Sequence, residues 1–477
     1  MTETKKKVTI RQWFILVAVG LFSFMSTLDS SIVNIALPTI SRETNIPMNQ
    51  TTWTVSIYLI GVSSLLILFG RLGDLLGKIK IFRIGTIIFT FGSFIAGVNL
   101  GIWFLLFARF IQSIGAAMTM SNSFGITSSS FPARLQGRAM SLIGIFVSLG
   151  AVTGPALGGI LLQFLPWSYI FWINVPVGLI AILLGAKLFP KSHPRKKITY
   201  IDWRGTILFF GTISSLFLGI EIGQVSGFLY LSTMVLFFIS IFCFGGFIHI
   251  ELICDKPLLD LRMFKNALFS ISILSAMFIF ITNFFASIIM PFYLQNLRDF
   301  SPGTAGLMMM TFPVIMLIIG PIGGILGDKF DKEWITFIGL FFVVFAQLGY
   351  THFQKYTSIT TVILFTGINA CGAALFQAPN NALVMSSVDK KSLGIAGSIN
   401  ALARNLGMVT GISIATTTLF TSMSHQVGHR VTSYIPNQPD VFLKGMHISF
   451  YISFILALAT LFITAYRLFT KKKQNAI

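Results

Sequence analysis

Charged residues are scarce in this chain. Asp, Glu, Lys and Arg together make up 10% of its 477 residues, whereas hydrophobic residues make up 54%. Soluble domains contain about 25% charged residues. The shortage of charge therefore excludes an ordinary soluble protein and predicts an integral membrane protein embedded in a lipid bilayer.

Cysteines and catalytic motifs are also few. The three cysteines, Cys243, Cys254 and Cys371, lie far apart and match no metal spacing, so we expect free thiols. The sequence has no nucleotide-binding loop, no zinc motif and no catalytic Ser/His/Asp setting. These absences argue against an enzyme, a metal site, a cofactor or the use of ATP by this chain.

Long apolar runs predict fourteen membrane-spanning helices, because about 20 apolar residues cross a bilayer. The basic segment from Met1 to Arg11 runs straight into the first apolar segment, which continues to Ala36. A cleavable signal has a shorter apolar core and a small-residue cleavage site, so we expect a retained span. The predicted spans are 12–36, 50–69, 81–99, 103–126, 138–164, 167–188, 204–223, 227–249, 268–294, 304–326, 334–352, 358–384, 394–423 and 446–469.

The basic residues are distributed unevenly between the two sides of these spans. The net charge is +19, and an even number of spans places both termini on one side together with most Lys and Arg residues. The opposite side holds Arg42, Arg298, Lys355, Arg430 and Lys444. This asymmetry predicts cytoplasmic termini in a multi-pass cell-membrane protein. The positive charge then faces anionic lipid, which argues against a nucleic-acid partner.

Two short motifs each occur twice in the chain. Leu149–Gly154 reappears with one change as Leu406–Gly411, and Gly70–Asp74 is similar to Gly324–Asp328. The offsets, 257 and 254 residues, are nearly equal, so each pair occupies the same place in its half of the chain.

The repeat predicts an all-α membrane protein with two six-helix halves. The N-terminal half comprises residues 1–190 and the C-terminal half residues 266–477, and two inserted helices with their linkers occupy 191–265. Parallel halves of this kind place a substrate site between them, near the bilayer midplane.

An acid, Asp29, lies deep within the first predicted span. Ionisable residues in lipid are costly and usually face a cavity or a partner, and the loss of water favours their neutral form. A proton carrier fits this position, and a structural acid paired with an Arg is the alternative. By charge, Arg109 in the fourth span is its most plausible partner. Asn34, about one and a half turns further along the same span, continues a polar path from Asp29.

Small residues in the fifth span mark a close helix contact. Gly150, Gly154 and Gly158 recur every four residues and share one helical face, which lets a second helix approach to backbone contact. Pro155 removes a backbone donor and is expected to kink the helix. Gly159 completes the motif. A packing face is the simplest interpretation.

The segment from Gly70 to Lys80 resembles the cytoplasmic loop motif of the major facilitator superfamily, with Lys78 at its first basic position and Ile79 in place of the second. The sequence further resembles the fourteen-span drug:proton antiporter branch (EmrB/QacA type) over essentially its whole length. The motifs that carry this second resemblance are Leu28–Pro38, Gly154–Gly159, Phe171–Gly178 and Pro257–Phe264.

The resemblance implies the major facilitator fold and roles for several residues. Asp29 and Arg109 would serve proton coupling. In the family the acid matching Asp74 pairs with an Arg at the start of span 5, here Arg138, and this contact holds the cytoplasmic face closed. Ordinary positive-inside loop charge is the alternative. The expected gating residues are Gly70, Gly73, Asp74, Gly77, Lys78 and Arg138.

Spans 9 and 10 resemble a substrate wall, because they are rich in aromatic side chains, which attract cations, and in Met, which adapts to varied ligands. Generic packing is an equally good explanation for any single residue. The candidate pocket residues are Asn34, Phe285, Tyr293, Met309, Gln377, Asn380 and Arg404.

One further acid, Glu221, lies well inside a span, in the two-helix insert. The family places the inserted helices outside the main bundle, so we expect Glu221 near the outer membrane interface with little functional weight.

These features together predict a proton-coupled multidrug efflux transporter, a monomer that exchanges protons for small lipophilic drugs by alternating access. Two alternatives stay open. One is a dedicated exporter of an anionic metabolite, lipid or siderophore, favoured by Arg109 and Arg404. The other is a non-transporting membrane sensor on the same fold.

Overall fold

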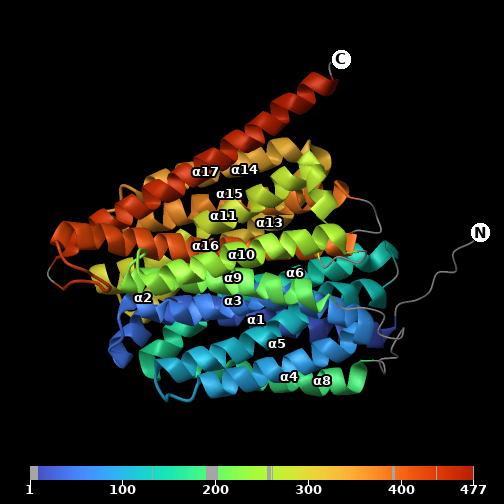
Figure 1. Ribbon diagram of the computed structural model, residues 1–477, viewed down its shortest axis with the longest axis horizontal. Helices are drawn as coiled ribbons and strands as arrows, with labels where there is room; N and C mark the ends of the chain where they lie inside the picture. The colour runs from blue at the N-terminus through green and yellow to red at the C-terminus, as the bar shows by residue number, and fades with distance from the viewer. Residues whose placement is uncertain are drawn as a thin grey trace, which may run out of the picture.

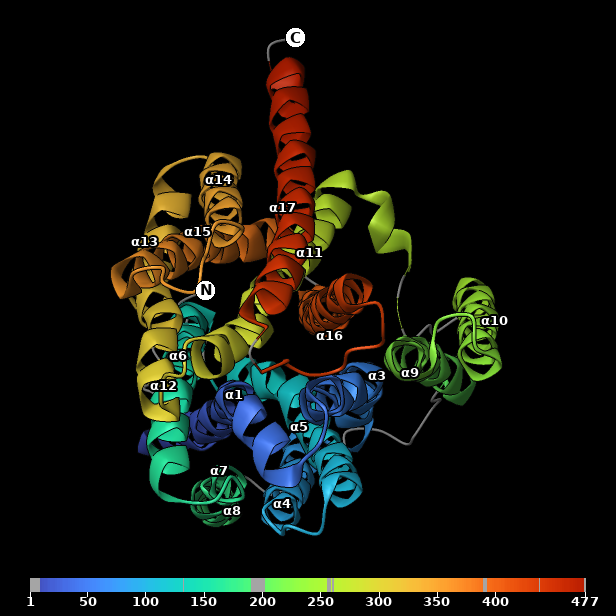
Figure 2. The same cartoon turned by 90° about the vertical axis from the view of Figure 1, so that its left-hand side faces the viewer.

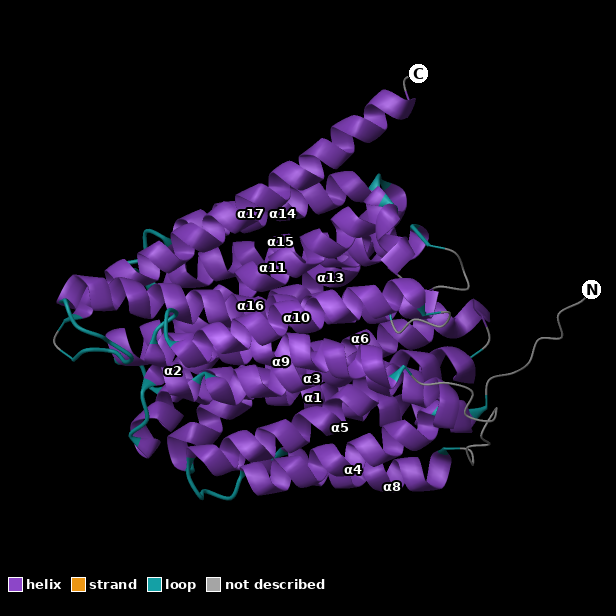
Figure 3. Cartoon of the chain, viewed as in Figure 1, coloured by secondary structure: helices purple, strands orange, loops and turns teal. Residues whose placement is uncertain are grey.

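The protein, in a computed structural model, is a bundle of long helices (Figures 1 and 3). The structure describes residues 9–131, 133–189, 202–254, 259, 261–388, 393–436 and 438–475. These residues contain no β-strand. The all-α prediction is thereby confirmed for the described part of the chain.

The N-terminal half supplies six long helices and two single turns of helix. The elements are α1 (Ile10–Thr44), α2 (Met48–Thr51), α3 (Trp53–Leu76), α4 (Lys78–Ala96), α5 (Ile102–Ser130), α6 (Ala133–Phe164), α7 (Tyr169–Trp172) and α8 (Asn174–Leu188).

The remaining helices form the insert and the C-terminal half. The insert consists of α9 (Trp203–Ser226) and α10 (Leu231–Ile253). Asp202 caps α9, because its Oδ1 accepts a hydrogen bond from the backbone N–H of Gly205 at 2.9 Å. The later elements are a 3-10 turn (Leu261–Lys265), α11 (Ala267–Phe292), a π-helical turn (Tyr293–Leu297), α12 (Pro302–Met309), α13 (Thr311–Lys329), α14 (Lys332–Tyr350), α15 (Ile359–Ser386), α16 (Leu393–Val427) and α17 (Pro439–Asn475).

Thirteen helical segments of the described chain are long and apolar enough to cross a membrane. A shorter apolar stretch, Leu149–Phe164 in α6, adds a further candidate. These segments are consistent with the fourteen predicted spans, and several extend beyond them by a few residues.

The helices gather into two groups with the insert at one side (Figure 2). Helices α1, α3, α4, α5 and α8 form one group, and α11, α13, α14, α15 and α17 form the other. Figure 2 shows α9 beside α3 and α16, with α10 on its outer side.

The repeated glycine motif packs in the same way in both halves. A methyl group added at Gly150 of α6 would lie 2.4 Å from the carbonyl oxygen of Phe24 in α1. A methyl group at Gly407 of α16 would lie 2.5 Å from the carbonyl oxygen of Met277 in α11. Because only glycine permits such backbone approach, the sequence repeat reports a repeated helix contact.

The two halves are joined at one end of the bundle, which we call the distal end. It carries α2 and residues 428–436, and it lies opposite the end at which α1 begins and α17 finishes (Figure 1). The backbone N–H of Met48 donates to Ser433 Oγ at 3.1 Å, and that of Asn49 donates to the Thr432 carbonyl at 3.1 Å. Among the described residues, no side-chain hydrogen bond joins the halves at the opposite end.

Candidate functional site

Asp29 lies fully buried in the middle of α1, and each of its carboxylate oxygens accepts hydrogen bonds. Oδ2 is 2.6 Å from Nη1 of Arg109 on α5. Oδ1 accepts from Nε2 of Gln112, one turn further along α5, at 2.8 Å, and from Nδ2 of Asn174 on α8 at 2.9 Å. Three helices of the N-terminal half therefore converge on one acid.

Arg109 is equally buried and is held from several sides. Its Nε donates to the carbonyl of Thr54 at the start of α3, at 2.9 Å. Its guanidinium carbon lies 4.3 Å from the ring centroid of Tyr58 and 5.6 Å from that of Phe171, where the ring faces attract the cation. Arg109 thus ties α5 to α1 and α3.

The structure brings together the pair that charge alone suggested and adds partners that the sequence analysis missed. Gln112 follows Arg109 at the spacing of residues on one helical face. Asn174 lies inside the Phe171–Gly178 motif. The helical spacing of Gln112 and the motif around Asn174 are both visible in the sequence, but an amide carries no charge from which a partner can be inferred.

The network has two chemically distinct states. While Asp29 is ionised, its charge balances that of Arg109, and loss of either partner would leave a buried charge uncompensated at a cost of about 3–5 kcal/mol. A proton on Asp29 would cancel the attraction. Arg109 would keep the Thr54 carbonyl and Gln112 Oε1 as acceptors, so α1 could move relative to α5.

The glycine motif of α6 packs against the turn of α1 that carries Asp29. A methyl group at Gly154 would lie 1.8 Å from Ser31 Oγ, which donates to the Gly150 carbonyl at 3.2 Å. Gly158 faces Ile32 of the same helix. The expected packing face therefore exists, and it contacts α1 beside the residue that carries the charged network.

The last part of the same motif faces the C-terminal half. A methyl group at Gly159 would lie 2.7 Å from the carbonyl oxygen of Pro302 in α12, and one at Gly306 would lie 2.3 Å from the carbonyl oxygen of Pro155. One helix thus contacts α1 of its own half and α12 of the other half through backbone.

The predicted cytoplasmic loop is largely helical. Helix α3 continues to Leu76, so the turn reduces to Gly77, whose φ of 104° favours glycine. The apolar run of the sequence ends before the helix does, because a helix can extend beyond the bilayer into water. Gly70 and Gly73 lie within α3, and Gly73 packs against Asn122 of α5.

The expected gating contact between Asp74 and Arg138 stays a prediction. Asp74 Oδ1 lies 3.1 Å from Lys78 Nζ, and both side chains are exposed. The side chain of Arg138 lies outside the described residues.

The candidate pocket residues occupy different environments. At the interface of the halves, Asn34 Nδ2 donates to Ser287 Oγ of α11 at 2.7 Å. Phe285 and Tyr293 are fully buried, and the Tyr293 hydroxyl donates to the Gln354 carbonyl at 2.8 Å. Asn380 donates to the Ser272 carbonyl at 3.0 Å, inside the C-terminal half.

The other candidate pocket residues lie in three different helices. Met309 in α12, Gln377 in α15 and Arg404 in α16 are half-buried. A cavity of about 700 Å³ lies elsewhere, at the end of the C-terminal half opposite the distal end. None of the candidate pocket residues lines it.

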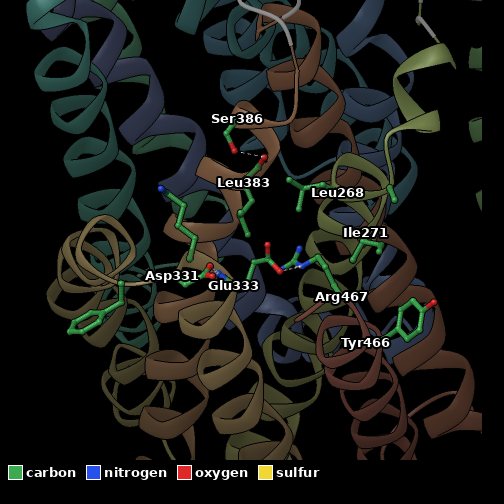
Figure 4. A pocket seen from close by; sticks show the side chains of 11 residues that line it. Leu268, Ile271, Asp331, Glu333, Leu383, Ser386, Tyr466 and Arg467 are labelled. Carbon is green, nitrogen blue, oxygen red and sulfur yellow. Dashed lines mark hydrogen bonds and ion pairs between the residues drawn. The ribbon is translucent and has the colours of Figure 1, made fainter. Parts of the chain in front are cut away.

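This cavity contains a second buried ion pair (Figure 4). Figure 4 shows Glu333 of α14 and Arg467 of α17 pointing toward each other, and Arg467 Nε lies 3.5 Å from Glu333 Oε2. Arg467 also donates to Ser272 Oγ at 3.0 Å and to Thr336 Oγ1 at 3.1 Å. These bonds tie together α11, α14 and α17 within one half.

Glu221 differs from its expected placement at the periphery. Its helix, α9, packs against both α3 and α16, and the side chain is 1% exposed. The residue lies near the distal end of α9, and its deep burial differs from the expected peripheral placement, because the carboxyl points into the bundle.

Comparison with known proteins identifies the fold and several relatives. The family model of the Major Facilitator Superfamily matches residues 19–412 and also 272–476. The chain is 32% identical to the riboflavin transporter RibZ of Clostridioides difficile, over 84% of this chain and 87% of the relative. It is 29% identical to the multidrug export protein EmrB of Escherichia coli, over 90% and 85%. It is 27% identical to the multidrug resistance protein Stp of Mycobacterium tuberculosis, over 89% and 79%.

A solved structure has the same fold at low sequence identity. It is a bacterial homologue of the human lysosomal transporter Spinster, in an inward-facing and unoccupied conformation, with a TM-score of 0.67 and 14% identity. The match covers 96% of this chain and 97% of that one. At this identity the likeness concerns the fold alone.

Proposed function

Because this chain belongs to the Major Facilitator Superfamily, we propose that it is a proton-coupled exporter of small lipophilic drugs that works by alternating access. The observation that carries the proposal is the buried network of Asp29, Arg109, Gln112 and Asn174, a protonatable acid held by one cation and two amides. Similarity to EmrB and Stp supports drug export.

In the proposed cycle, proton binding and drug binding favour different positions of α1. Ionised Asp29 holds α1 to α5 through Arg109. Uptake of a proton from the distal side neutralises Asp29, weakens this attachment and accompanies release of the drug. Helix α1 also contacts α6 and α11, so its movement is transmitted to the interface of the halves. Protons are the coupling ions, and no cofactor is required.

The charge of the network suggests the substrate class. Asp29 is the one acid of this network, and Arg109 balances its charge. A dication would need a second acid nearby, so we propose monovalent cations, zwitterions and neutral amphiphiles as substrates. The transporter acts as a monomer in a bacterial inner membrane, with both termini in the cytoplasm and the distal end facing outward.

The decisive test compares the wild-type protein with Asp29→Asn in proteoliposomes that contain a pH-sensitive dye. We expect several unrelated lipophilic drugs to dissipate a pH gradient through the wild-type protein, and no response through Asp29→Asn. Asn keeps the shape of the side chain and removes the titratable group. Proton-coupled transport that survived in Asp29→Asn would overturn the assignment of Asp29 as the proton carrier.

A dedicated metabolite transporter is the second candidate, and the similarity to RibZ favours it. The half-buried Arg404 in α16 provides a cation that an anionic metabolite could use. A panel of anionic, neutral and cationic compounds in the same vesicles separates the two functions. A response to a single metabolite would favour the dedicated transporter, and a response to several unrelated amphiphiles would favour drug export.

A further inference from the structure

A second buried acid lies outside the Asp29 network. Glu221 in α9 is 1% exposed, and neither of its carboxylate oxygens forms a hydrogen bond with any described group. An ionised carboxylate without partners is very costly away from water. Glu221 therefore needs either a proton or a change in its surroundings.

The glycines of α9 define the direction in which Glu221 points. A methyl group at Gly219 would lie 3.1 Å from the Phe237 ring of α10, and one at Gly223 would lie 3.2 Å from Thr233 of α10. Two residues correspond to about 200° around a helix, so Glu221 faces away from α10. Gln224, on the same face as Glu221, donates to the Ser413 carbonyl of α16 at 3.3 Å.

The surroundings of Glu221 are polar, and no cation of the described residues forms an ion pair with its carboxyl. The hydroxyl of Ser56 in α3 lies near the carboxyl without reaching hydrogen-bond geometry. Ser413 of α16 is also buried, and its hydroxyl is unpartnered among the described groups.

The charged and titratable groups of the neighbouring elements contact other groups or lie farther along their helices. Arg430 of the distal segment donates to the backbone carbonyl of Gln224. Tyr58 of α3 lies against Arg109. His249 and Glu251 lie at the opposite end of α10, and His425 lies three turns beyond Ser413 in α16.

The start of α3 separates the two buried acids. Thr54 and Tyr58, one turn apart, both contact Arg109, whereas Ser56 between them faces Glu221. Asp29 and Glu221 thus flank the same turn of one helix. A movement of that turn changes the surroundings of both carboxyl groups.

We propose that Glu221 is a second proton-binding group, protonated while the distal end is closed and ionised when it opens. Helix α3 belongs to the N-terminal half, α16 belongs to the C-terminal half, and α9 packs against both. Opening of the distal end separates α3 from α16 and admits water to the carboxyl, which then releases its proton. Acidic conditions thereby favour the closed distal end. The inference rests on the proposed function only in taking the proton as the coupling ion.

Two measurements on the full-length protein without drug test this inference. The first is an infrared titration, in which the carbonyl-stretch band of a protonated carboxyl group should be lost in Glu221→Gln and kept in Asp29→Asn. The second is the distance between spin labels at Glu43→Cys and Gln438→Cys, two exposed distal positions, after the three native cysteines are replaced by alanine. We expect this distance to shorten as the pH falls, and to stay short at all pH values in Glu221→Gln.

Gln224→Leu serves as the matched control, because it disturbs the same helix face without removing a titratable group. It should keep the infrared band and the pH-dependent distance, and Glu221→Asp should keep both as well. An unchanged infrared band and an unchanged distance titration in Glu221→Gln would overturn the proposal. Drug-driven proton flux in Asp29→Asn vesicles tests the proposed function separately, since the titrations use no drug.

Discussion

The two halves of the molecule contain equivalent polar networks, one charged and one neutral. In the N-terminal half Gly115 of α5 packs against α4, and in the C-terminal half Gly372, 257 residues later, packs in the same way against α14. At this offset Arg109 corresponds to Thr366 and Gln112 to Asn369. The duplicated position thus holds a cation in one half and a hydroxyl in the other.

The neutral network has the same outline with weaker bonds. Asn369 donates to Asn283 Oδ1 at 3.3 Å and accepts from Gln347 Nε2 at 3.4 Å. The bonds from Arg109 and Gln112 to Asp29 measure 2.6 and 2.8 Å, as is typical when one partner is ionised. The comparison teaches that both halves place polar groups at this depth, whereas the ion pair at this position belongs to the N-terminal half.

The largest expected difference between the halves comes from removing the cation. Arg109→Leu leaves Asp29 buried without its countercharge, so we expect the free energy of unfolding to fall by about 3–5 kcal/mol. The corresponding change in the neutral network, Thr366→Val, should cost about 1 kcal/mol. Thermal unfolding in detergent at neutral pH measures both. Equal losses would show that the two networks are energetically alike.

A smaller difference is expected for the two amides. Gln112→Leu removes hydrogen bonds to Asp29 and Ser93, and bonds to a charged group contribute about 1.5–3 kcal/mol. Asn369→Leu removes bonds between neutral groups, for which about 0.5–1.5 kcal/mol is expected. In the vesicle assay the pH dependence of transport should shift in Gln112→Leu and stay unchanged in Asn369→Leu. A shift in both variants would mean that groups of both halves contribute to the proton site.

The smallest difference is expected at the repeated glycine contacts, where the halves should behave alike. Gly150→Ala and Gly407→Ala both place a methyl group against a backbone carbonyl, so each should cost about 1–3 kcal/mol through overpacking. Gly320→Ala is the control, because a methyl group there meets no atom within 4 Å. Thermal unfolding of the three variants measures the effect. Tolerance at Gly407 with loss at Gly150 would show that the repeat is not symmetric.

The sequence predicted those features that depend on spacing or on charge. The four-residue spacing of Gly150, Gly154 and Gly158 defines a helix face whatever its partner. Asp29 and Arg109 were paired because an isolated charge within a span requires a countercharge. Both features were therefore visible before the arrangement of the helices was known.

Other features depend on contacts between distant helices and could not be predicted. Asn174 reaches Asp29 across 145 residues, and nothing in an amide side chain specifies such a partner. The burial of Glu221 depends on how closely α9 approaches α3 and α16. The pocket candidates Asn34 and Asn380 are predicted from residue type, which does not specify their hydrogen-bond partners, Ser287 and the Ser272 carbonyl.

The contact between α6 and α12 has a mechanical consequence. Gly159 and Gly306 bring the two backbones together at Pro302 and Pro155, so the closest approach of the two helices is made by backbone and not by side chains. In the proposed alternating-access cycle, this contact would serve as a pivot on which one half rocks against the other while its close packing is retained. The energetic barrier to this motion would then reside in the polar contacts at the distal end, such as those of Met48 with Ser433 and of Asn49 with Thr432.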